Sequence, residues 1–204
     1  MNIELFTAFL LITTVLIIAP GPIVTLIIST GVLQGWRAAL VTVAGTTLGN
    51  AMLLAAIASA LGWVHAHADL LFNALRWTGA AYLIWLGVQA WRHAGEGGEP
   101  IRETGRTRFV RGLLVALSNP KTIVFFTAFL PLFIDPRLPT GPQLAAMCVA
   151  SVLIAGASDC AWAVAAGMGR AWFMKPSRVK LLGRLSGTVL IGGGLWLSLA
   201  RRTS

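Results

Sequence analysis

Long stretches of apolar residues, separated by short polar connections, make up most of this chain. Six of them have about the length that an α-helix needs to cross the hydrocarbon core of a bilayer, which is about 20 residues. These stretches are Leu5–Ser29, Ala38–Gly62, Leu70–Trp91, Phe109–Ile134, Gln143–Met168 and Leu185–Ala200. The pattern therefore predicts an all-α integral membrane protein with six transmembrane helices.

Two of these stretches contain prolines far from their ends. Ala19-Pro20-Gly21-Pro22 interrupts the first, and Asn119-Pro120-Lys121 interrupts the fourth. A proline inside a helix removes one backbone hydrogen bond and clashes with the carbonyl four residues earlier. Because no water replaces that bond within a bilayer, such a break must face protein or a wet cavity. We expect spans 1 and 4 to be broken here, as in transporters whose broken helices form the substrate site.

The two halves of the chain correspond in position. Each half holds three spans, the first of which carries a proline break, and an Arg-x-x-Gly sequence (Arg76 to Gly79, Arg184 to Gly187) enters the third. Because three is an odd number, the halves cross the membrane in opposite orientations, which predicts a 3+3 inverted repeat. We expect one transporter domain over residues 1–204, with repeats at about 1–91 and 109–204 and a cytoplasmic linker at about 92–108.

Composition and charge exclude other classes of protein. The 204 residues are 56% hydrophobic and 11% charged, whereas globular domains are about 25% charged. The net charge of +9 lies in the connections between apolar stretches, which argues against nucleic-acid binding. Connections 1–2, 3–4 and 5–6 hold eleven basic residues, and the opposite side holds four. Because basic residues favour the cytoplasmic side, this asymmetry places connections 1–2, 3–4 and 5–6 in the cytoplasm and both termini in the periplasm.

The connections and the N-terminus complete this topology. The arginines of the 3–4 linker are expected to meet anionic lipid headgroups. The N-terminus lacks the basic segment of a cleaved signal peptide, so Leu5–Ser29 is expected to be a retained span.

The first break exposes backbone groups that suit an amino acid. Pro20 leaves the Leu16 carbonyl without its helical donor, and Pro22 does the same to Ile18. The helix that starts near Pro22 presents free N–H groups, which suit a carboxylate, while freed carbonyls suit an ammonium group. Gly21 allows close backbone approach. The alternative is a passive kink, but two breaks in corresponding positions favour a substrate site that includes Pro20, Gly21, Pro22, Asn119 and Pro120.

Two ionisable residues lie within spans. Lys121 is deep in span 4, where a lysine costs roughly 2.5–3.5 kcal/mol to insert. Asp159 is the only acidic residue inside a span, at the middle of span 5. A static ion pair between them is one interpretation. A functional role is the other, with Lys121 binding a substrate carboxylate or acting as counter-ion and Asp159 coupling transport to protons.

Small and polar residues mark helix contacts. Gly45 and Gly49 lie on one face of span 2, so a neighbouring helix can pack closely against them. Gly79, Gly156 and Gly187 are predicted to act in the same way. Asn50, at a level comparable to Asp159, is predicted to form an interhelical hydrogen bond or to contact the substrate.

Cofactor chemistry has little support. Cys148 and Cys160 form no CxxC motif, and His65 and His67 alone are weak evidence for a metal site. We therefore expect no cofactor, no metal and no enzymatic activity.

Together these features resemble the lysine-exporter/homoserine-threonine-resistance (LysE/RhtB) family of bacterial amino-acid exporters. The matching pieces are Ala19-Pro20-Gly21-Pro22, Gly45-x-x-x-Gly49, Gly79-Ala80-Ala81-Tyr82-Leu83 with Gly87, Ser118-Asn119-Pro120-Lys121 and Asp159. The resemblance implies about six spans, an inner-membrane location and proton-driven efflux of amino acids or their derivatives. Relatives that include exporters of basic amino acids carry an acid where this chain has Asn50, so neutral substrates such as homoserine or threonine are favoured.

Other functions stay open at this point. Export of basic amino acids or of another small metabolite is the nearest alternative. An integral membrane enzyme or redox subunit would need paired thiols, metal ligands or a nucleophile–base pair within the spans, and a channel would need a wider polar pore. The sequence leaves open whether the chain forms a homo-oligomer.

Overall fold

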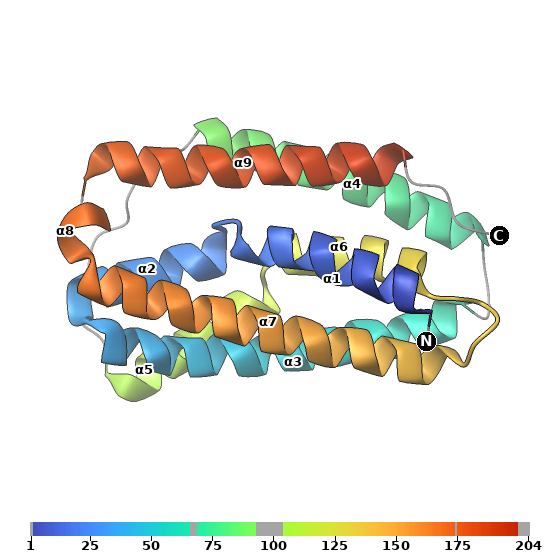
Figure 1. The fold of residues 1–204 in the computed structure, drawn as a ribbon, viewed down its shortest axis with the longest axis horizontal. Helices are drawn as coiled ribbons and strands as arrows, with labels where there is room; N and C mark the ends of the chain where they lie inside the picture. The colour runs from blue at the N-terminus through green and yellow to red at the C-terminus, as the bar shows by residue number, and fades with distance from the viewer. Residues whose placement is uncertain (1, 66–68, 93–103, 174, 200–204) are drawn as a thin grey trace.

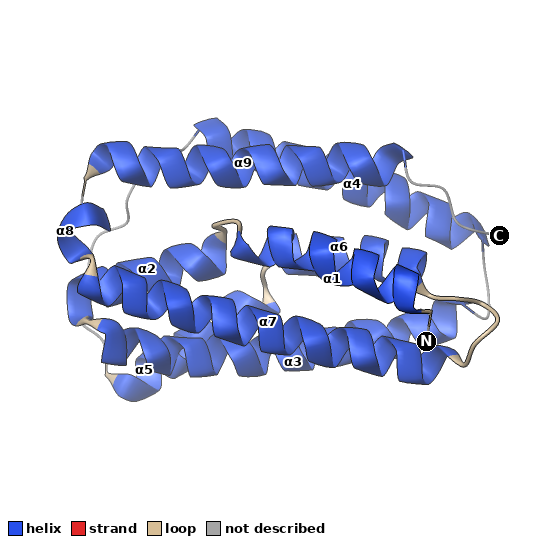
Figure 2. Ribbon diagram, in the orientation of Figure 1, coloured by secondary structure: helices blue, strands red, loops and turns tan. Residues whose placement is uncertain are grey.

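The computed structural model describes residues 2–65, 69–92, 104–173 and 175–199. Within these ranges every regular element is a helix, and Figure 2 shows no strand among them. The helices are α1 (Ile3–Ile18), α2 (Pro22–Gln34), α3 (Trp36–His65), α4 (Asp69–Arg92), α5 (Gly105–Leu117), α6 (Pro120–Phe129), the 3-10 helix η1 (Leu130–Phe133), α7 (Thr140–Met168), α8 (Arg170–Phe173) and α9 (Pro176–Leu199). The predicted all-α class is confirmed.

Both predicted proline breaks are present. Helices α1 and α2 meet at a bend of 46°, and α5 meets the α6–η1 segment at a bend of 40°. Three further helices have segments long and apolar enough to cross a membrane, namely Trp36–Leu61, Thr140–Met168 and Lys180–Leu199. With each bent pair taken as one span, the described residues contain up to five spans. Helix α4 contains only a shorter apolar segment, Ala80–Gln89.

Several helices are longer than the apolar stretches that predicted them. Helix α9 begins at Pro176 rather than Leu185, and α5 begins at Gly105 rather than Phe109. These added turns are rich in Lys and Arg, which an apolar pattern does not detect although such residues favour helices. Helix α2 continues past the predicted Ser29 and ends at Gln34. Its C-cap is Gly35, whose φ of 89° is unfavourable for a residue with a side chain.

The two halves of the chain run in opposite directions. Figure 1 shows α1 and α2 directed toward one end of the bundle, and α5 and α6 directed toward the other. Helix α1 begins and α9 ends at the same end of the bundle. The first turns of α3 and α5, together with α8, lie at the opposite end.

That opposite end carries most of the basic side chains. Those within the described residues are Arg37, Arg92, Arg106, Arg108, Arg111, Arg170, Lys175, Arg178, Lys180 and Arg184. Arg137 lies at the other end, in the connection between η1 and α7. Arg102, Arg201, Arg202 and the side chain of Arg76 are outside what the structure describes. The charge asymmetry expected from sequence therefore coincides with one end of the bundle.

An aromatic core holds α6 against its neighbours. Phe125 stacks on Phe129 with ring centroids 4.3 Å apart, and Phe129 stacks on Trp196 of α9 at 5.1 Å. Phe9 of α1 meets Phe133 edge-on at 5.5 Å. Because aromatic pairs add about 0.5–1.5 kcal/mol beyond their buried area, these contacts fix the position of the helix that follows the second break.

Glycines permit two close helix crossings. Where α3 crosses α5, a Cβ atom added to Gly45 would overlap the Phe109 carbonyl oxygen, and one added to Gly49 would lie 2.7 Å from the Leu113 oxygen. Where α4 crosses α9, a Cβ at Gly187 would lie 2.5 Å from the Gly87 oxygen. Backbones approach this closely only without side chains between them.

Gly156 and Gly79 were also predicted to pack closely, but the structure shows no such contact at Gly156 and does not describe the surroundings of Gly79. Gly156 has room, because the nearest neighbour of an added Cβ is Thr47 Oγ1 at 3.5 Å. Gly79 lies within α4, but its surroundings are outside what the structure describes.

We expect Gly45→Ala to destabilise the protein strongly and Gly156→Ala to leave it stable. The added methyl at position 45 forces α3 and α5 apart, at a cost of about 3 kcal/mol or more. The same change at position 156 fills ordinary space and adds helix propensity of about 1 kcal/mol. Thermal unfolding of the detergent-purified variants measures the difference. Equal melting temperatures for the two variants would contradict the close α3–α5 crossing.

Candidate functional site

The first break leaves one helix start uncapped. Helix α1 ends at Ile18 and the next residue, Ala19, is extended, with φ −61° and ψ 125°. Pro22 is the first residue of α2, where its missing N–H costs no hydrogen bond. The N-cap residue is Gly21, which has no side chain to bond to the first-turn N–H groups. These donors and the positive end of the α2 dipole are therefore available to another group.

The second break is arranged differently. Helix α5 ends at Leu117, and Asn119 is the N-cap of α6, with Pro120 at the first helical position. The Asn119 Oδ1 atom accepts a hydrogen bond from the Lys121 backbone N–H at 3.2 Å, and its Nδ2 donates to Thr122 Oγ1 at 2.9 Å. The Asn119 side chain is thus engaged in starting its own helix.

Lys121 brings the two breaks together. Its Nζ atom donates a hydrogen bond of 2.7 Å to the Ala19 carbonyl oxygen, across 102 residues of sequence. A Cβ added to Gly21 would lie 3.2 Å from Lys121 Cδ, so the lysine passes directly over this glycine. Only 7% of Lys121 is exposed. The bond satisfies both the buried ammonium and a carbonyl that the end of α1 leaves free.

Helices α3 and α7 bring polar groups to the same place. Asp159 of α7 is 3% exposed, and its Oδ2 atom accepts a hydrogen bond of 3.1 Å from Thr46 Oγ1 of α3. Asn50 lies one turn further along α3 and is 6% exposed, but its Oδ1 atom has no hydrogen-bond partner. An unpaired buried acceptor costs roughly 1–3 kcal/mol, so this atom is suited to a donor that enters from the cavity.

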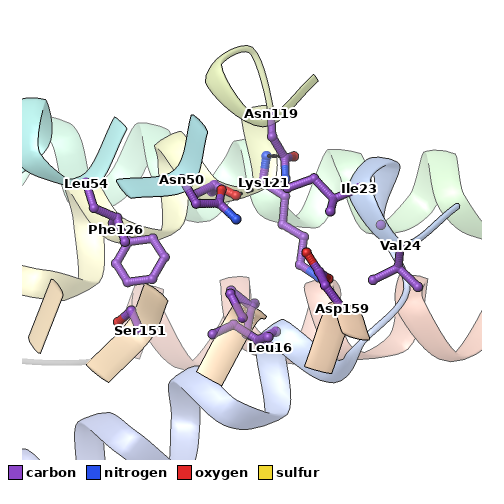
Figure 3. A pocket seen from close by; sticks show the side chains of 14 residues that line it. Leu16, Ile23, Val24, Asn50, Leu54, Asn119, Lys121, Phe126, Ser151 and Asp159 are labelled. Atoms are coloured by element: carbon purple, nitrogen blue, oxygen red, sulfur yellow. Dashed lines mark hydrogen bonds between the residues drawn. The ribbon is translucent and has the colours of Figure 1, made fainter. Parts of the chain in front are cut away.

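These groups surround a cavity of about 50 Å³. Figure 3 shows Lys121 extending across it toward Asp159, with Asn50 on one side and Leu16 on another. This volume is well below the range of about 300–1,000 Å³ typical of small-molecule sites, so the cavity is narrow for an amino acid. Its walls are formed by Leu16, Ile17, Gly21, Ile23, Val24, Asn50, Leu54, Asn119, Lys121, Thr122, Phe126, Ser151, Ala155 and Asp159.

Lys121 and Asp159 each have a partner other than one another. Among the side chains that the structure describes, these two form no direct ion pair, although their charges interact across the cavity. The simplest interpretation of the sequence, a static ion pair, therefore does not describe this arrangement. Each of the two opposite charges is thus held by a partner of its own, and both side chains line the same cavity.

The structure thus gathers most of the residues that the sequence proposed for the site. Gly21, Asn50, Asn119, Lys121 and Asp159 line the cavity, and Pro20, Pro22 and Pro120 shape the breaks beside it. The carbonyl that meets Lys121 is that of Ala19 rather than those of Leu16 and Ile18, because the chain turns extended at Ala19 and directs its oxygen out of the helix.

Besides Thr122, whose Oγ1 accepts the bond from Asn119 Nδ2, two polar residues of the site were not predicted. Thr46 holds Asp159, and Ser151 lines the cavity while its hydroxyl donates to the Met147 carbonyl at 2.7 Å. A signal for each exists in the sequence. Thr46 precedes Asn50 by four residues, and Ser151 precedes Asp159 by eight, spacings that place polar groups on one face of an otherwise apolar helix.

Within the described residues, the two thiols form no second site. Cys148 is half-buried and Cys160 is exposed, and both are free. Within the described part of the chain, no three residues of the types His, Cys, Asp and Glu come together as they would around a metal ion. His67 and the side chain of His65 lie outside that part.

Thr46→Val should lower the melting temperature, whereas Thr47→Val should change it little. Valine keeps the shape of threonine but leaves the buried Asp159 carboxylate without its donor, a loss of roughly 1–3 kcal/mol. Thr47 is the matched control, since it is the neighbouring residue of the same helix, is half-buried and makes no contact with Asp159. Unfolding temperatures in one detergent make the comparison. Equal shifts in the two variants would show that Thr46 does not support Asp159.

The chain is similar to known efflux proteins along its whole length. Residues 14–201 match the family model described as LysE type translocator. A homoserine/homoserine lactone efflux protein of Salmonella typhimurium is 33% identical over 204 residues, which cover 98% of this chain and 99% of that protein. A leucine efflux protein of an Enterobacter species is 32% identical over 129 residues, 59% of each chain.

Membrane proteins without a stated activity also match. One from Pseudomonas aeruginosa is 31% identical over 212 residues, covering 97% of this chain and 95% of its own. No solved structure matches the chain.

Proposed function

Because this chain belongs to the LysE type translocator (LysE/RhtB) family of membrane transporters, we propose that it is a secondary exporter of neutral amino acids or small amino-acid derivatives of the homoserine type. Membership makes it a multi-pass membrane transporter of the amino-acid efflux class and not an enzyme. Our proposal adds the substrate class, the site, proton coupling and the orientation in the membrane.

The observation that carries the proposal is the meeting of the two proline breaks around opposite charges. The uncapped first turn of α2 and the Lys121 ammonium offer donors to a carboxylate. The unpaired Oδ1 of Asn50 and the Asp159 carboxylate offer acceptors to an ammonium group. An α-amino acid carries both charged groups on one carbon atom, so a cavity that offers both donors and acceptors complements it.

The size of the cavity requires the site to open. At about 50 Å³ it is narrow for an amino acid, so we propose that the structure represents a state in which the site has yet to widen around its substrate. In our proposal residues 1–204 form one domain of six spans, with α4 as the sixth. The halves α1–α4 and α5–α9 form a 3+3 inverted repeat, and their opposite directions in Figure 1 support this arrangement. Rocking of one half against the other would expose the site alternately to each side.

The coupling ion in this proposal is a proton carried by Asp159. A carboxylate can hold or release a proton, whereas a buried amide cannot. Asp159 lies opposite Lys121, so the arrival of a substrate ammonium or carboxylate changes the charge that Asp159 faces. Substrate and proton would then compete or cooperate at one site, which couples export to the proton gradient.

The orientation follows from the basic end of the bundle. We propose that the protein lies in the bacterial inner membrane with the end that carries Arg37, Arg108 and Arg178 in the cytoplasm. Both termini would then face the periplasm, and the basic side chains would meet anionic lipid headgroups.

Asp159→Asn should abolish proton-driven transport. In proteoliposomes, the wild-type protein is expected to move radiolabelled homoserine in response to an imposed pH gradient, and the variant should show no response because its amide carries no exchangeable charge. Asp135→Asn is the matched control, since Asp135 lies in the connection before α7 and away from the cavity. Proton-dependent transport that survives in Asp159→Asn would refute the coupling role of Asp159.

Asn50→Asp should shift selectivity toward basic amino acids. A second carboxylate beside Asp159 would attract the additional positive charge of lysine, and we expect the ratio of lysine to homoserine transport to rise about tenfold, equivalent to about 1.4 kcal/mol. Asn2→Asp adds the same charge at the start of α1, where either side chain can cap the helix. It removes the bond from Asn2 Nδ2 to Asp135, but this contact is away from the cavity, so the ratio should stay unchanged. An unchanged ratio in Asn50→Asp would place the substrate away from Asn50.

A further inference from the structure

A second, apolar pocket lies directly beside the polar cavity. It has a volume of about 400 Å³ and lies between α1, α6 and α9. Its walls include Val15 and Leu16 of α1, Phe125 and Phe129 of α6, and Gly193 and Trp196 of α9. This volume falls within the range of about 300–1,000 Å³ typical of small-molecule sites.

One side chain separates the two spaces. Leu16 lines both the polar cavity and the apolar pocket, and it is buried between them. On α6, Phe126 faces the cavity and its neighbour Phe125 faces the pocket. A change in the position of the Leu16 side chain would therefore join the two spaces into one site that is polar at one end and apolar at the other.

The pocket has room because α9 presents no side chain to it at Gly192 and Gly193, between Val189 and Trp196. A Cβ added to Gly192 or Gly193 would have no neighbour within 4 Å. The adjacent Gly194 is different, since its added Cβ would lie 2.7 Å from Ile84 Cγ1 of α4. The glycine run thus packs α9 against α4 on one side and leaves open space on the other.

Another apolar groove, of about 560 Å³, lies between α3 and α7, but none of its lining residues also lines the polar cavity. Other helix pairs of the bundle are closely packed. Helices α3 and α5 are in backbone contact at Gly45 and Gly49. Helices α2 and α7 are similarly close at Gly31, where an added Cβ would lie 3.0 Å from Ala166 Cβ. Since the cavity of about 50 Å³ is narrow for an amino acid, a bound amino acid must extend its side chain elsewhere, and Leu16 is the residue through which the cavity adjoins apolar space.

We propose that the pocket between α1, α6 and α9 receives the aliphatic side chain of the transported amino acid, with Leu16 as the partition that moves aside. The inference rests on the proposed function, since the ammonium and carboxylate groups of the substrate stay in the polar cavity. It makes Leu16 and Gly193 determinants of selectivity between substrates with large apolar and with small polar side chains. A lipid acyl chain is the competing occupant, because the pocket is lined partly by exposed residues such as Leu11 and Val15.

The test measures transport of radiolabelled leucine and homoserine in proteoliposomes and compares their ratio among variants. Gly193→Leu fills the pocket and should lower the leucine-to-homoserine ratio about tenfold, within the range that one or a few methylenes contribute in an apolar pocket. Gly193→Ala should also lower the leucine-to-homoserine ratio, but less than Gly193→Leu does. It keeps the test decisive if Gly193→Leu fails to fold. Leu16→Ala should raise the ratio, because the partition is smaller.

Gly141→Leu is the matched control. Gly141 is also a helical glycine with no neighbour within 4 Å of an added Cβ, but it lines a separate apolar groove between α3 and α7. The leucine-to-homoserine transport ratio of Gly141→Leu should equal that of the wild type.

The possible failures are distinguishable. If the wild-type protein moves neither amino acid, the proposed function fails and this inference fails with it. If the wild type moves both and the Gly193 variants leave the ratio unchanged, only the pocket assignment is overturned. Loss of a co-purified phospholipid from Gly193→Leu at an unchanged ratio would also overturn it and would assign the pocket to lipid.

Discussion

The bond between the Lys121 ammonium and the Ala19 carbonyl is the interaction on which the rest of the site depends. A helix broken within a membrane must satisfy its exposed backbone groups without water. A lysine at that depth must likewise find a partner, at an insertion cost of roughly 2.5–3.5 kcal/mol. The hydrogen bond of 2.7 Å from Lys121 Nζ to the Ala19 oxygen satisfies both the ammonium and the carbonyl. The break in one half of the chain is therefore stabilised by the break in the other half.

The two breaks are similar in sequence but not in what they leave unsatisfied. Asn119 caps α6 with its own side chain, whereas Gly21 leaves the start of α2 uncapped. Asn50 also keeps an acceptor without a partner, while Thr46 holds Asp159. The cavity thus retains free donors and a free acceptor. This residual polarity, rather than the charges of Lys121 and Asp159 alone, is what makes a zwitterion a suitable ligand.

Glycine contacts determine which parts of the bundle are rigid. Helices α3 and α5 cross at backbone contact, as do α4 and α9, so neither pair can approach more closely. Helix α1 meets α9 across an apolar pocket instead. A site that must widen from about 50 Å³ to accept an amino acid can do so toward this pocket, because Leu16 borders both spaces. The close α3–α5 and α4–α9 crossings thus stay fixed, while the pocket between α1 and α9 gives the site space to expand.

The sequence by itself determined the helices, the two breaks and the buried charges. Proline acts on its own backbone and burial penalises any lone charge, so neither effect depends on distant neighbours. Only the tertiary structure decided that Lys121 meets Ala19, that Thr46 rather than Lys121 bonds to Asp159, and that Gly156 has room while Gly45 has none. The starts of α5 and α9 were also misplaced, because their basic first turns interrupt the apolar pattern. Such features depend on which faces of separate helices come together, and no local pattern encodes that geometry.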